Sequence, residues 1–182
     1  FPSLMVWRRF HPTEPAASRN FCLGPSTTET HLGRLSSDTP DGVDDMSDTF
    51  AFSPWVDRER QLVDDVYITP FRTVHPVETY ALRVEHTKTS ATLCYSADSA
   101  YTPALVEAAQ GVDVFLCEAA WGETSEDKAP DMHMSGAEAG RLAREAGVKK
   151  LVLIHLQPWG DVAATYAAAA REFDGEIVVG AA

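Results

Sequence analysis

Short apolar runs rich in β-branched and aromatic residues recur from residue 66 onward, and each is followed by a polar turn or a helical pattern. Runs of this length and composition predict β-strands. Two of them, 81–86 and 91–96, flank the polar turn TKTS, a pattern typical of a β-hairpin. The runs are VYITPFRTV (66–74), ALRVEH (81–86), ATLCYS (91–96), VDVFLCEA (112–119), KLVLI (150–154) and EIVVGA (176–181).

Helical patterns with recognisable ends separate the later runs. Residues 102–110 begin with Thr102, a good capping residue, and Pro103, which suits a first helical turn. Residues 136–146 directly follow Ser135, which can form a capping box with Glu138 in the first turn. A third helix is predicted over 162–173. Strands alternating with helices predict an α/β fold in which helices cover a sheet.

The first third of the chain is less regular. FPSLMVWRRF (1–10) predicts an amphipathic helix, NFCLG (20–24) a strand, and residues 27–35 a second helix. The segment SSDTPDGVDDMSD (36–48) carries five aspartates, but their spacing does not match a calcium-binding EF-hand, so we expect a solvated loop. The first helix has no capping residue before it, which predicts further chain upstream of Phe1.

Composition limits the functions that such a fold could serve. With 182 residues and 45% hydrophobic content, we expect a single domain over residues 1–182. The formal charge of -12 disfavours binding of long nucleic acids but leaves small anions open. Three cysteines without a CxxC pair fit a reducing cytosol, and no apolar run is long enough to span a membrane. We therefore expect a cytoplasmic protein with no membrane contact, and homodimerisation stays open.

Three polar residues follow predicted strands, namely His75, Asp98 and His155. The carboxyl ends of strands are where ligands gather in layered α/β folds. Imidazole and carboxylate groups are ligands for zinc, manganese or iron, and one carboxylate can bridge two ions. From their spacing alone, these three residues are more often hydrogen-bonded residues at the rim of a sheet than metal ligands. The flanking sequence has to distinguish the two interpretations.

The flanking segments are HPVETYALRV, LCYSADS, GVDVFLCEAAW and HMSGAEAGRLAREAGVKKLVLIHLQPW. Together they resemble the carboxyl half of the metallo-β-lactamase superfamily, in its branch of phosphodiesterases that includes ribonuclease Z and actinobacterial cyclic-nucleotide phosphodiesterases. The resemblance implies a four-layer αββα sandwich, incomplete at the amino end of this chain. It implies two divalent metal ions, with zinc the leading choice.

The resemblance also implies roles for individual residues. His75 would bind the first metal, Asp98 would bridge both metals and take part in catalysis, and His155 would bind the second metal. His133 would contact phosphate or act as the general acid for the leaving oxygen. The hydroxide that attacks phosphorus would be activated by the two ions.

Two departures from the family pattern affect these expectations. Ala97 stands before the bridging aspartate, where the family commonly has glycine, so alanine would be strained if this turn needs a positive φ. The signature His-x-His-x-Asp-His, which supplies most metal ligands in the family, does not occur in this sequence. We expect it upstream of Phe1, and we expect the 182-residue chain alone to be weakly active or inactive.

The spacing between ligands distinguishes the branches. Ribonuclease Z members of the family carry a long tRNA-gripping arm between the ligand histidine and the bridging aspartate, but here His75 and Asp98 lie only 23 positions apart. A small phosphodiester, with a cyclic nucleotide as the leading choice, is therefore the expected substrate. A ribonuclease Z and a non-catalytic binding domain on the same fold remain the alternatives. The segment PVETY after His75 disfavours the branches of the superfamily that act on β-lactams or thioesters.

Several other residues have two interpretations each. Trp121 and Trp159 could stack on a base or pack at the rim of the site. Glu118 could orient a histidine of the metal site or fix a loop. Arg8 and Arg9 could meet a phosphate or lie on an exposed helix face.

Overall fold

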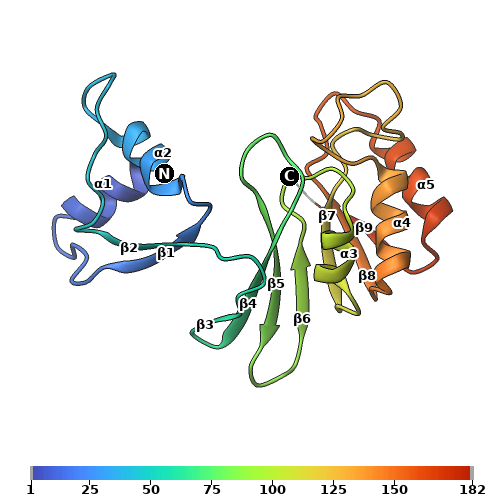
Figure 1. Cartoon of the computed structure of the whole chain (residues 1–182), viewed down its shortest axis with the longest axis horizontal. Helices are drawn as coiled ribbons and strands as arrows, with labels where there is room; N and C mark the ends of the chain where they lie inside the picture. Colours follow the sequence, from blue (N-terminus) through green and yellow to red (C-terminus); the bar gives the residue numbers. More distant parts are fainter. Residues whose placement is uncertain (1, 181–182) are drawn as a thin grey trace. The chain divides into compact units, whose positions relative to one another are not determined.

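The structure is a computed structural model that describes residues 2–180. Contacts within the chain define two compact units, one up to Trp55 and one from Val56 onward (Figure 1). We call them the amino-terminal and the carboxy-terminal unit. One domain can contain two such units, so the single domain expected over residues 1–182 stays a prediction.

The amino-terminal unit pairs two strands and two helices. The strands are parallel, with Asn20 opposite Phe50, and the side chains of Met5, Met46 and Phe50 form a small buried core. The two helices and the first strand were predicted from the sequence, whereas the second strand was not. The elements are α1 (Pro2–Phe10), β1 (Asn20–Gly24), α2 (Thr28–Ser36) and β2 (Phe50–Pro54).

Arg9 organises the aspartate-rich loop of this unit. Its guanidinium group donates hydrogen bonds to Asp44 at 2.6 Å, to Asp48 at 2.8 Å and to the hydroxyl of Thr49 at 3.0 Å. Only 17% of the Arg9 side chain is exposed. Arg9 is therefore half-buried and not on an exposed helix face, and it binds carboxylates of its own chain; contact with a phosphate stays a prediction. The loop is solvated only in part, because two of its aspartates pair with Arg9.

The carboxy-terminal unit contains one seven-stranded sheet whose strand order follows the order of the chain (Figure 1). Pairing is antiparallel from β3 to β6 and parallel from β6 to β9. The predicted hairpin of 81–86 and 91–96 is the pair β5 and β6. The strands are β3 (Gln61–Val63), β4 (Val66–Arg72), β5 (Tyr80–His86), β6 (Thr92–Tyr95), β7 (Val114–Glu118), β8 (Lys150–Ile154) and β9 (Glu176–Val179).

Helices connect the parallel strands and cover one face of the sheet. They are α3 (Pro103–Ala109), α4 (Gly136–Ala146) and α5 (Val162–Glu172). Leu105 of α3 and Leu142 of α4 belong to one buried cluster with Phe115 and Leu151 of the sheet. Alternate residues of β7 and β8 are buried in this way, while the residues between them point to the other face and are only half-buried.

The predicted helix ends are present. Thr102 accepts a hydrogen bond from the Ala104 amide, and Ser135 and Glu138 form the predicted capping box. Gly147 ends α4 with φ of 66°, a left-handed conformation that favours glycine. The predicted α/β class is therefore confirmed. Among the described residues, no helix combines the length and the apolar character needed to cross a membrane.

Candidate metal centre

The predicted site residues lie at one edge of the seven-stranded sheet because their strands run in the same direction. β5 is antiparallel to both β4 and β6, so β4 and β6 point the same way, and β7 and β8 are parallel to β6. His75 comes three residues after the end of β4, Asp98 three after β6, and His155 directly after β8. Their side chains thus start from the carboxyl ends of three strands.

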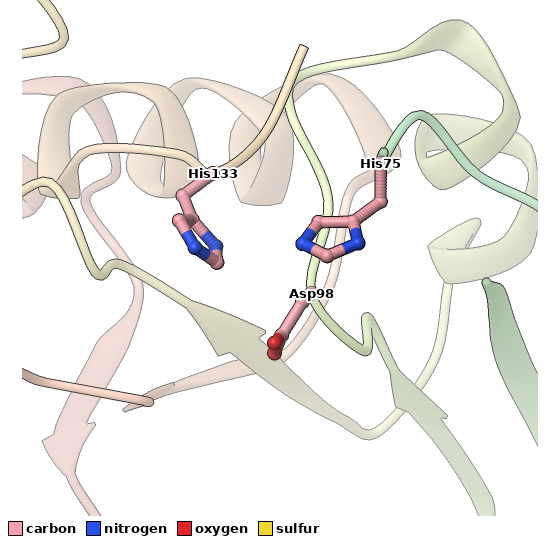
Figure 2. Close-up of side chains that lie close together, drawn as sticks. All are labelled: His75, Asp98 and His133. Carbon is pink, nitrogen blue, oxygen red and sulfur yellow. The ribbon is translucent and has the colours of Figure 1, made fainter. Parts of the chain in front are cut away.

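A compact group of donors forms at this edge. Figure 2 shows the side chains of His75, Asp98 and His133 converging, and one donor atom from each lies within 4.8 Å of the other two. Glu118, His133 and His155 form a second group with the same spacing. His133 belongs to both groups, with its ring centroid 5.4 Å from that of His75 and 5.1 Å from that of His155.

Asp98 lies close to both of the other predicted metal ligands, His75 and His155. One of its carboxylate oxygens lies 3.2 Å from Nδ1 of His155, and it shares the first donor group with His75. The structure thus brings all four predicted site residues together, and His133 belongs to both donor groups. Their assignment as ligands or as a proton donor stays a prediction.

The donor chemistry fits a divalent metal ion. Nδ1 of His75 is buried and has no hydrogen-bond partner among the described residues. A buried polar atom left without a partner costs roughly 1–3 kcal/mol, and coordination of a metal would remove this cost. Two or three imidazoles with carboxylates are a donor set suited to zinc, manganese or iron.

Glu118 is completely buried and accepts hydrogen bonds from four groups. One oxygen accepts from the Ser99 amide at 2.7 Å and from Nδ1 of His133 at 2.9 Å. The other accepts from the amides of Ala120 at 3.1 Å and Met134 at 3.3 Å. Burial raises the pKa of Glu118, and the hydrogen bonds from Ser99 and His133 partly oppose this rise. Glu118 therefore both orients a histidine and fixes loops.

The contact with Glu118 determines which nitrogen of His133 faces the donor group. An ionised carboxylate only accepts hydrogen bonds, so Nδ1 of His133 carries the proton and Nε2 remains free. In the neutral ring, Nε2 offers a lone pair to a metal. In the protonated ring, it offers a proton to a leaving oxygen. The geometry accommodates either role.

The two tryptophans near the site differ in exposure. The ring of Trp121 packs edge-on against His133, with centroids 4.9 Å apart, so it supports the histidine. Trp159, in the segment after His155, is 84% exposed and touches solvent over most of its surface. Sequence reasoning missed Ser99, a buried residue that bonds to the loops around it. Its only sequence signal was its place directly after Asp98.

Comparison with known proteins identifies the fold family. Residues 20–156 match the family described as beta-lactamase superfamily domain. The chain is 42% identical over 176 residues to the uncharacterized protein Rv1339 of Mycobacterium tuberculosis, a match that covers 97% of this chain and 63% of Rv1339. It is also 36% identical over 110 residues to the probable metallo-hydrolase YhfI of Bacillus subtilis, covering 60% of this chain and 44% of YhfI. The chain thus spans less than two thirds of the length of these relatives.

Solved structures agree on the fold. The crystal structure of the metallo-beta-lactamase fold protein YhfI from Bacillus subtilis matches with a TM-score of 0.71 at 24% identity, over 88% of this chain and 61% of YhfI. Human tRNase Z, short form, matches with a TM-score of 0.69 at 16% identity, over 99% of this chain and 70% of that chain. At these identities the likeness establishes the fold and nothing more.

These comparisons confirm the fold class predicted from the sequence. The family match covers most of both units, from β1 to the residue after His155. The fold implies divalent metal ions, which the donor groups around His133 fit. The chain therefore belongs to the metallo-β-lactamase superfamily.

Proposed function

We propose that this chain is part of a metal-dependent hydrolase that cleaves a small phosphodiester, with a cyclic nucleotide as the leading substrate. The observation that carries the proposal is the convergence of the three predicted ligands beside His133: donor atoms of His75, Asp98 and His133 lie within 4.8 Å of one another, and an Asp98 oxygen lies 3.2 Å from Nδ1 of His155. A carboxylate with an imidazole on either side suits two neighbouring ions, because one carboxylate can bridge them. Membership of the superfamily supports hydrolysis as the class of reaction.

The predicted site residues would have separate roles in binding metal and in donating a proton. His75, Asp98 and His155 would hold the metals, with Asp98 between the two positions. Divalent ions, when bound, lower the pKa of a water molecule and stabilise the negative charge of a displacement at phosphorus. His133 would give a proton to the departing alcohol from Nε2, while Glu118 holds the ring by Nδ1.

The segment between His75 and Asp98 supports a small substrate. It consists of a tight connection, the strands β5 and β6, and the turn between them. The amide of Thr73 bonds to the carbonyl of Thr79 across the connection, and Lys88 in the turn pairs with Asp65 at 2.8 Å. This compact hairpin offers no arm to grip tRNA. The net charge of -12 also disfavours long polyanions.

The test separates proton donation from metal binding. Metal content and hydrolysis of cyclic nucleotides are measured for the complete protein loaded with Zn²⁺ or Mn²⁺, together with its His133→Ala variant. Loss of a general acid lowers turnover by roughly 10²–10⁴-fold. We expect this loss while most of the metal is retained. Equal losses of metal and turnover would instead place His133 among the ligands.

Two other outcomes would favour the alternatives. Cleavage of precursor tRNA, with binding that weakens steeply as salt is added, would indicate a ribonuclease Z. Human tRNase Z shares this fold. Failure to bind two ions, together with absence of turnover in the complete protein, would indicate a non-catalytic binding domain.

A further inference from the structure

Ser99 is a buried residue placed directly after Asp98. Its exposed fraction is 0%, and its hydroxyl group uses both of its hydrogen-bonding roles. Oγ accepts a hydrogen bond from the Val74 amide at 3.2 Å and donates one to the Ala100 carbonyl at 2.7 Å. The Val74 amide has this side chain, rather than a strand neighbour, as its partner.

Val74 immediately precedes His75, so this hydrogen bond reaches the segment that presents the first predicted ligand. The Val74 carbonyl is also bound, because it accepts a hydrogen bond from the Ala100 amide at 2.8 Å. Val74 and Ala100 form an isolated antiparallel bridge. The His75 segment is thus attached to the Asp98 segment by one backbone bond and one side-chain bond.

The backbone of Ser99 reaches a third segment. Its amide donates to the carboxylate of Glu118 at 2.7 Å, and the same oxygen accepts from His133 at 2.9 Å. Glu118 is at the end of β7 and His133 precedes α4. Ser99 is therefore bonded directly to the segment before His75 and, through one carboxylate, to His133.

We propose that Ser99 is a positioning residue of the metal centre, whose hydroxyl fixes His75 against Asp98. The inference rests on the proposed metal-binding function. Ser99 would hold the metal ligands in place before the metal binds, although Ser99 is not itself one of the ligands. Groups that hold ligands in place typically contribute 10–100-fold to metal affinity. A chain lacking the Ser99 hydroxyl would let the His75 segment move away from Asp98, since only the backbone bond between Val74 and Ala100 would remain.

The first experiment measures Zn²⁺ affinity of the 182-residue chain by competition with a chelating dye. We expect Ser99→Ala to weaken Zn²⁺ binding by about 10–100-fold. Ser99→Thr, which keeps a hydroxyl at Cβ, should remain closer to the wild type. Equal weakening by both substitutions would show that packing, and not the hydroxyl, is responsible, and would overturn the proposal.

Thr102→Ala is the matched control. Thr102 lies three residues after Ser99 and is 9% exposed. The Thr102→Ala substitution also removes one hydroxyl that accepts a hydrogen bond from a backbone amide, here that of Ala104 at the start of α3. Loss of such a cap costs about 1 kcal/mol in stability. Zn²⁺ affinity should not change, because the bond of Thr102 is to its own helix. Weakening by Thr102→Ala that matches Ser99→Ala would overturn the proposal.

The second experiment needs no metal. Hydrogen exchange of the Val74 amide should be faster in metal-free Ser99→Ala than in the wild type, because its acceptor is lost. Unchanged exchange would show that the Ser99 hydroxyl does not hold the Val74 amide, and would overturn the positioning role. A wild-type chain that binds no Zn²⁺ contradicts the proposed function and the positioning role together. Wild-type Zn²⁺ binding with unchanged affinity in Ser99→Ala overturns the positioning role alone.

Discussion

Two residues of the metal centre hold a backbone conformation that side chains disfavour. Ala97 has φ of 54° and His155 has φ of 55°, both in the left-handed region. Ala97 thus has the positive φ at which an alanine before Asp98 is expected to be strained. Such strain costs of order 1–3 kcal/mol and persists where the surrounding structure fixes the chain. At His155 the turn follows β8 at once and sends the imidazole toward Asp98.

Ala97→Gly should stabilise the protein by roughly 1 kcal/mol, because glycine adopts positive φ without the clash of a Cβ. The measurement is the midpoint of urea unfolding. Ala104→Gly is the control, because Ala104 lies within α3, where glycine is expected to cost about 0.5–1 kcal/mol. If both substitutions destabilised the protein equally, the conformation at Ala97 would not be strained.

The site residues differ in how far the sequence reveals them. His75, Asp98, His133 and His155 could be found because each stands in a recognisable local segment. Glu118 was identified with both of its roles. Ser99 could not be found, because its partners Val74 and Glu118 come from other segments of the chain. The pairing of Arg9 could not be predicted for the same reason, since its acceptor Asp44 is 35 residues away.

At the scale of elements, α4 and α5 approach each other closely at two glycines. A Cβ atom on Gly140 would lie 2.4 Å from the backbone oxygen of Ala169, and one on Gly136 would lie 2.2 Å from that of Thr165. Both contacts involve backbone atoms of α5, which cannot rotate away. The two helices pack into the same buried cluster against the sheet.

Gly140→Ala should destabilise the protein by about 1–3 kcal/mol or more, although alanine favours helices more than glycine does. The reason is the clash with Ala169, which forces α4 and α5 apart. Thermal unfolding measures the change. Gly160→Ala provides a comparison, because the added methyl group would meet the Gln157 carbonyl at 3.2 Å, a tight contact that a loop can relax. Similar melting temperatures for Gly140→Ala and the wild type would contradict the close packing.

Element prediction succeeded where periodicity and caps agreed, as in α3 and α4. It failed for β2 and β3. β3 has only three residues, too few to show an alternating pattern, and it forms by pairing with β4. β2 ends in proline, and its partner β1 lies far back in the sequence. In both cases the strand depends on pairing with a neighbour rather than on local sequence.

At the scale of the whole molecule, metal binding and folding are linked. The donors come from four segments after β4, β6, β7 and β8, so the arrangement in Figure 2 exists only in the folded chain. A ligand that binds only the native state raises the free energy of unfolding, by about 2.7 kcal/mol at 100 times its dissociation constant.

Zn²⁺ should therefore raise the melting temperature of the wild-type chain in a concentration-dependent way, and EDTA should reverse the shift. Asp98→Asn should reduce the shift strongly, because an amide is a weaker ligand that cannot bridge two ions as a carboxylate does. Asp64→Asn is the control, since Asp64 lies in the turn between β3 and β4 and outside both donor groups. An equal shift in all three proteins would locate the stabilising metal elsewhere.

The strand order of the carboxy-terminal unit has a consequence for how it folds. From β3 to β9, each strand pairs with the strand made just before it. A growing chain emerges from its amino end, so each new strand finds the strand it pairs with already made. His75, Asp98, His133 and His155 emerge in this same order. The donor set is therefore completed only when β8 has joined the sheet.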